Sequence, residues 1–147
     1  SSIVEELKDV PRAFHEARLA MDVGKVFYQE NSVFSYKELG IGRLLHQLPR
    51  NICEMFLQEV YDGRADTQFD EETLQIVNKF FEYNLNISET ARQLYLHRKT
   101  LLYRMEKRQK QTGLESRTFE DAVTLKIAMM VSKHMNHTVE TEDKKHD

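Results

Sequence analysis

The sequence has very few of the residues that cross-link or interrupt a chain. Its 147 residues include one cysteine, Cys53, two prolines and five glycines. A lone cysteine excludes an intramolecular disulfide and is typical of a reducing, cytosolic compartment, so we expect a buried thiol on a helix. With so few prolines and glycines, long segments can keep the 3.6-residue spacing of helical apolar positions. The length suffices for one core of ordinary size or two small ones.

Long apolar runs and recognisable catalytic patterns are missing as well. No stretch approaches the roughly 18 apolar residues of a membrane span, and no basic-then-apolar export signal opens the sequence. We therefore expect a cytoplasmic protein without a membrane partner. We find no Ser/His/Asp arrangement, phosphate loop or convincing carboxylate pair, so we do not expect an enzyme. The spacing of His134, His137, Asp143 and His146 is a poor argument for a metal, and no cofactor is expected.

What is present is helical periodicity over most of the chain, which predicts a mostly α-helical bundle with a C-terminal helix-turn-helix. One helix is expected over residues 11–27, with Phe14, Ala17, Ala20 and Met21 buried. Residues 32–39 could form a short strand or a turn of helix, and the periodicity does not decide between them.

A polar, glycine-containing segment around residue 63 indicates a linker. It suggests a first part at 1–62, a linker at 63–68, a second part at 69–136 and a flexible tail at 137–147. Asp70 is placed to cap the first helix of the second part, which should end near Tyr83.

Two helices with almost no loop between them are predicted over residues 88–111. Ser88 is expected to cap the first, and Ala91 is small where the second helix must cross it closely. His97 should cap the second helix. Leu94, Leu96, Leu101 and Met105 have the spacing that would fill the inside of such a corner, which is the geometry of a recognition helix.

This region is basic although the chain as a whole is not. Residues 88–117 contain eight basic and three acidic side chains, whereas the formal net charge of the chain is −3. If Leu101 and Met105 face inward, the other side chains at the start of the second helix must face outward. The residues predicted to read bases in the major groove of double-stranded DNA are Arg98, Lys99, Leu102 and Tyr103.

A second group is predicted to contact phosphates, which would make affinity fall with salt. This group comprises Ser88, Thr90, His97, Thr100, Arg104, Lys107 and Arg108. We expect a homodimer, because helix-turn-helix proteins usually read two half-sites, and surplus apolar surface on the last helix, including Met129, could pair two chains. The alternative is a helical protein-protein interaction module whose basic face docks on an acidic partner.

The run at residues 86–104, Asn-Ile-Ser-Glu-Thr-Ala-Arg-Gln-Leu-Tyr-Leu-His-Arg-Lys-Thr-Leu-Leu-Tyr-Arg, resembles the signature of the PucR/CdaR family of bacterial transcription regulators. The segments at 112–114, 119–122 and 125–128 are similar to the stretch that follows in that family. Residues 11–48 are similar to the tail of its GGDEF-like middle region. The family commonly has asparagine at the position of Lys99, and this departure affects the expected base preference.

The resemblance implies a Fis-like DNA-binding domain at the C-terminus of a regulator that responds to small metabolites such as sugar diacids or purine-catabolism intermediates. It also implies that the effector is bound by an N-terminal domain absent from this sequence.

Overall fold

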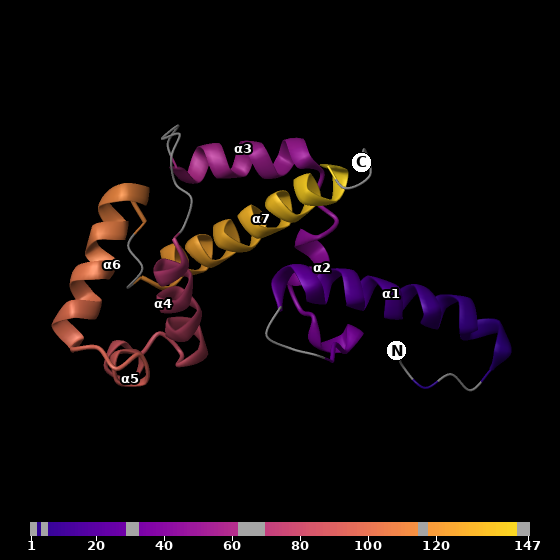
Figure 1. Cartoon of the computed structure of the whole chain (residues 1–147), viewed down its shortest axis with the longest axis horizontal. Helices are drawn as coiled ribbons and strands as arrows, with labels where there is room; N and C mark the ends of the chain where they lie inside the picture. Colours follow the sequence, from indigo (N-terminus) through magenta and orange to yellow (C-terminus); the bar gives the residue numbers. More distant parts are fainter. Residues whose placement is uncertain (1–2, 4–5, 29–32, 62–69, 115–117, 144–147) are drawn as a thin grey trace. The chain divides into compact units, whose positions relative to one another are not determined.

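The regular elements in the described part of the chain are all helices (Figure 1). The computed structural model describes residues 3, 6–28, 33–61, 70–114 and 118–143. The elements in these ranges are α1 (Val10–Phe27), α2 (Gly42–Leu45), α3 (Arg50–Tyr61), α4 (Glu71–Glu82), α5 (Ile87–Gln93), α6 (Arg98–Thr112) and α7 (Phe119–Asp143), with short 3-10 helices η1 (Leu7–Asp9) and η2 (Tyr36–Glu38). This confirms the mostly α-helical class.

The contacts divide the chain into two compact units. Unit 1 comprises Ser1–Cys53 and Met130–Asp147, and unit 2 comprises Glu54–Met129. The linker predicted at 63–68 lies outside the described residues, so the domain limits stay predictions. The segment left open between strand and helix contains the 3-10 helix η2, and within the described ranges no strand occurs.

In unit 1, α1 buries Ala20 as predicted, but the rest of its buried face differs from the prediction. Ala20, Val23 and Val26 are almost completely buried, whereas Phe14 is 67% exposed and Met21 50% exposed. The prediction for Phe14 and Met21 was therefore wrong. In a helix these two side chains lie roughly half a turn away from Val23, and it is the Val23 side that packs on η2 and α2.

α7 is longer than its composition predicted. Its polar end continues as helix to Asp143, although fraying was expected from about Asn136. Its residue His134, in unit 1, has its ring centroid 5.3 Å from that of His46. Burial, followed by the nearby His46, lowers the pKa of His134 below its ordinary value of 6.5.

The described part of the chain shows neither a metal-binding cluster nor a membrane-spanning helix. There, no three His, Cys, Asp or Glu side chains gather in a way that could hold a metal ion. No helix in the same ranges has both the length and the apolar composition needed to cross a membrane.

Candidate nucleic-acid interface

The helix-turn-helix begins with a well-capped α4. Asp70 precedes the helix, and its Oδ1 accepts hydrogen bonds from the Thr73 backbone N–H at 2.8 Å and the Thr73 hydroxyl at 2.6 Å. This confirms Asp70 as the predicted cap. The Thr73 hydrogen bonds are the main cause that lowers the pKa of Asp70, and Arg108 contributes less. The carboxylate therefore stays charged at the positive end of α4, where a negative charge is favourable.

A tight turn connects α4 to α5. α4 ends at the predicted place, and Asn84 and Leu85 have left-handed backbone conformations with φ of 52° and 61°. The next residue, Asn86, caps α5, because its Oδ1 accepts from the Glu89 N–H at 2.9 Å. The predicted cap, Ser88, is instead an exposed residue inside the first turn of α5, so that prediction was two residues late.

Thr90 does not have the place that sequence reasoning assigned to it. Its side chain is completely buried, and its hydroxyl donates to the Asn86 carbonyl at 2.7 Å. This geometry disagrees with the predicted phosphate contact, because a DNA backbone cannot reach a side chain in the core. The hydroxyl satisfies its own hydrogen bond within the helix, which is how a buried threonine is normally accommodated.

The second turn, residues 94–97, joins α5 to α6. Leu94 ends α5, Tyr95 adopts a left-handed conformation, and the Leu96 N–H donates to the Ala91 carbonyl at 2.9 Å. α6 then begins at Arg98, with the exposed His97 at the N-cap position as predicted.

A buried cluster holds α4, α5 and α6 together. It consists of Ile76, Phe80, Ala91, Leu101 and Met105, and Leu94 packs against it. Leu101 is completely buried and Met105 is 7% exposed, which confirms the predicted inner face of α6. Ala91 is also buried, as expected for the small residue at a close helix crossing. Because these contacts come from three helices, they set the angle at which α6 projects.

The start of α6 exposes the residues that were predicted to read bases. Arg98, Lys99 and Tyr103 are exposed, and Leu102 is half-buried. Tyr103 exposes 68% of its surface. Of the remaining candidates on α6, Lys107 is exposed and Thr100 is half-buried. A charged, hydrogen-bonding surface therefore surrounds the N-terminal part of α6, which is the part that enters the major groove in helix-turn-helix proteins.

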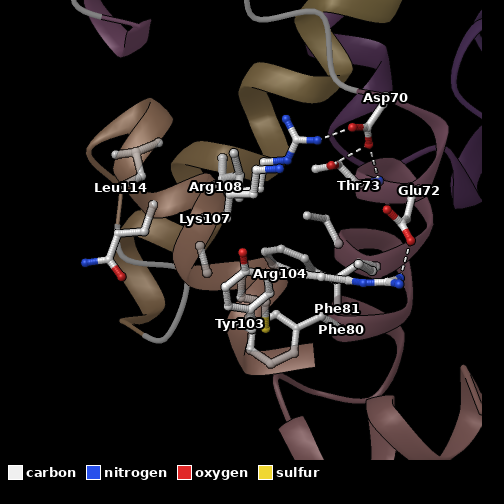
Figure 2. Close-up of a pocket in the computed structure, with 16 residues that line it drawn as sticks. Asp70, Glu72, Thr73, Phe80, Phe81, Tyr103, Arg104, Lys107, Arg108 and Leu114 are labelled. Atoms are coloured by element: carbon white, nitrogen blue, oxygen red, sulfur yellow. Dashed lines mark hydrogen bonds and ion pairs between the residues drawn. The ribbon is translucent and has the colours of Figure 1, made fainter. Parts of the chain in front are cut away.

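Two predicted phosphate ligands point elsewhere. Arg104 forms an ion pair with Glu72, and Arg108 forms one with Asp70 (Figure 2). Both acidic residues lie at the N-terminal end of α4, so the guanidinium groups bridge α6 to α4. Sequence reasoning missed this because the partners are 32 and 38 residues away along the chain.

These ion pairs lie beside a cavity of unit 2. The cavity has a volume of about 210 Å³ and lies among α4, α6 and the first turns of α7 (Figure 2). Its wall is largely apolar and includes Ile76, Val77, Phe80, Phe81, Met105 and Leu125. Beside this cavity α6 lacks close side-chain packing on α4, and the two ion pairs provide additional contacts between these helices.

The first part of α7 packs against α4 within unit 2. Leu125 and Met129 form a second buried cluster with Val77. Met129 is 2% exposed, so it is not the surplus surface for chain pairing that was predicted. Phe119, the first residue of α7, is 72% exposed.

Comparison with known proteins gives a consistent result. Residues 73–131 match the PucR C-terminal helix-turn-helix domain. The chain is 30% identical to the purine catabolism regulatory protein of Bacillus subtilis (strain 168) over 134 residues, which are 90% of this chain and 25% of that protein. It is 26% identical to the carbohydrate diacid regulator of Escherichia coli (strain K12) over 125 residues, which are 84% of this chain and 32% of that protein. The chain thus spans about a quarter to a third of these relatives. No solved structure matches it.

Proposed function

We propose that this chain, as a member of the family of bacterial transcription regulators that carries the PucR C-terminal helix-turn-helix domain, binds operator DNA with α6 as the recognition helix. One observation carries this proposal. Leu101 and Met105 are buried while Arg98 and Lys99 are exposed, so the basic start of α6 faces outward from a fixed support.

The proposed contacts differ in what they supply. Arg98 and Lys99 would donate to guanine acceptors, Tyr103 to a base or a phosphate, and Leu102 would touch a thymine methyl group. Phosphate contacts would come from Ser88, His97, Thr100 and Lys107. Arg104 and Arg108 are left out of this set, because their guanidinium groups are already paired with carboxylates of α4.

Selection from a random duplex pool would give the operator, and fluorescence anisotropy with the selected duplex would measure affinity. Arg98→Ala should weaken operator binding about 5- to 150-fold and relax the preference at one base, because a good base contact contributes about 1–3 kcal/mol of discrimination. Lys107→Ala should weaken binding to all duplexes alike and lower the salt slope by about 0.9. The matched control is Lys25→Ala, which replaces an exposed lysine of α1 in unit 1. It should change neither the affinity for the operator nor the salt slope. Wild-type protein that binds no selected duplex would refute the proposal.

We also propose that two copies bind one operator. A single recognition helix reads only a few base pairs, and the usual solution is a dimer that reads half-sites about 10 base pairs apart. Light scattering of the protein with and without the selected duplex measures this. A complex containing one chain would exclude it.

The regulator acts on bacterial DNA, so we place it in the cytoplasm and assign it no catalytic activity. The relatives with a named role are regulators of purine catabolism and of carbohydrate diacids. We propose that a small-molecule effector of such chemistry binds to an N-terminal domain outside this sequence. Calorimetry of this chain with sugar diacids and purine-catabolism intermediates should give no heat, and measurable heat would place effector recognition within residues 1–147.

A further inference from the structure

Tyr95, in the turn between α5 and α6, combines backbone strain with almost complete exposure. Its φ is 55°, and its side chain is 96% exposed. A left-handed conformation is unfavourable for residues with a Cβ atom, and glycine adopts it without that penalty. Residues with a strained backbone are found most often at functional sites, because such a conformation persists only where the surrounding structure holds it.

The turn itself explains the conformation but not the tyrosine. The Tyr95 N–H donates to the Arg92 carbonyl at 3.2 Å, and the Leu96 N–H donates to the Ala91 carbonyl at 2.9 Å. This is the hydrogen-bond pattern of a Schellman motif, in which glycine is the usual residue at the left-handed position. Glycine would close the turn equally well, so the backbone does not require an aromatic side chain here.

Packing does not explain the tyrosine either. The two other non-glycine residues with positive φ among those described are Asn84 and Leu85. Asparagine tolerates this conformation, and Leu85 packs against the buried cluster of α4, α5 and α6. Tyr95 has neither justification, because nearly all of its surface faces solvent.

The surroundings of Tyr95 are suited to an anion. An open groove of unit 2 is lined by Ser88, Ala91, Arg92, Tyr95, Leu96, His97 and Arg98. Its polar members are hydrogen-bond donors, namely the hydroxyls of Ser88 and Tyr95, the imidazole of His97 and the guanidinium groups of Arg98 and Arg92. The Arg92 guanidinium is already paired with the Glu89 carboxylate at 2.6 Å, so the donors available to an anion are the other four. The groove borders the start of α6, so it would face the DNA backbone when α6 enters the major groove.

We propose that Tyr95 is a DNA-contacting residue whose hydroxyl donates a hydrogen bond to a backbone phosphate beside the groove occupied by α6. This inference rests on the function proposed above. Tyr95 belongs to the turn that precedes the recognition helix and not to the helix, which favours a phosphate over a base edge. The contact would position α6 on any duplex and would carry no sequence preference.

Two substitutions separate the hydroxyl from the backbone. Tyr95→Phe removes only the hydroxyl and should weaken binding about 10- to 150-fold, the range expected for a hydrogen bond to a charged group. The loss should be equal on the selected and on a scrambled duplex. The slope of log affinity against log salt should not change, because tyrosine is neutral and releases no counterion. Tyr95→Gly should weaken binding at least as much while raising the melting temperature, because it relieves the strain.

Asn84→Gly is the matched control, since it changes another left-handed position in a helix-ending turn and should leave DNA affinity unchanged. Wild-type affinity for Tyr95→Phe would overturn the inference, as would a loss confined to the selected duplex. If Arg98→Ala weakens binding but both Tyr95 variants do not, the inference fails and the DNA-binding function stands. If wild-type protein binds no duplex, the proposed function itself has failed.

Discussion

Arg104 and Arg108 provide the sharpest test of how α6 is used. Both are basic residues of a recognition helix, yet the structure pairs them with Glu72 and Asp70. We expect Arg104→Ala and Arg108→Ala to lower stability and to leave the salt dependence of DNA binding almost unchanged. Replacing a residue that binds phosphate would instead lower the salt dependence of DNA binding and leave stability almost unchanged.

The magnitude follows from exposure. The side chains of Arg104 and Glu72 are 36% and 57% exposed, and those of Arg108 and Asp70 are 23% and 55% exposed. Partly exposed ion pairs contribute about 0.2–1 kcal/mol each, so the two together should contribute about 1 kcal/mol. For a unit of this size that corresponds to a fall of about 4–8 °C in melting temperature for the double variant. The fall should shrink at high salt, because screening weakens exposed pairs.

A double-mutant cycle isolates the ion pair from the helix cap. Asp70→Asn removes the charge but keeps a side chain that caps helices as well as aspartate does. Combined with Arg108→Ala, it should show a coupling of about 0.5 kcal/mol in thermal or urea denaturation.

Anisotropy titrations at several salt concentrations give the second measurement. Lys107→Ala should lower the salt slope by about 0.9, whereas Arg104→Ala and Arg108→Ala should not. The reasoning would be refuted if each arginine variant lowered the slope by that amount with an unchanged melting temperature. That result would mean that both side chains leave α4 and bind phosphates in the complex.

Three further predictions concern the core, a helix cap and pH. In urea denaturation, Leu101→Ala should lower the free energy of unfolding by about 3–5 kcal/mol, because the side chain is completely buried. Leu102 is half-buried, so Leu102→Ala should lower it clearly less. Equal losses would mean that the buried and exposed faces of α6 are misassigned. Asn86→Ala should lower the free energy of unfolding by about 1 kcal/mol, because it removes the cap of α5, whereas Ser88→Ala should leave it nearly unchanged. The reverse order would mean that Ser88 is the cap. Because the pKa of His134 is lower in the folded protein than its ordinary value of 6.5, His134 of the unfolded chain binds a proton at a higher pH than His134 of the folded chain. The His134 contribution is therefore complete above pH 6.5 and is lost below it, so the urea midpoint should drop between pH 7.5 and 5.5. His134→Gln should flatten that drop, and an identical pH profile for the variant would contradict the assignment.

Several features could be predicted from the sequence because they depend on neighbours along the chain. The helical class follows from the periodicity of apolar residues and the scarcity of proline and glycine. The start of α4 at Asp70, the end of α6 at Gly113 and the buried positions of Leu101 and Met105 are likewise local, since caps and helix faces involve residues three or four apart. The family signature also lies within one continuous run.

Other features were decided only by the tertiary structure. Arg104 and Arg108 have the same local sequence features as a phosphate ligand, and only the approach of α4 gives them carboxylate partners more than thirty residues away. Likewise, the packing of α1 on η2 and α2 decided which of its apolar residues are buried and left Phe14 exposed. Periodicity shows that a helix has an apolar face, but which side chains lose contact with water depends on elements distant in the sequence, whose positions no local pattern contains.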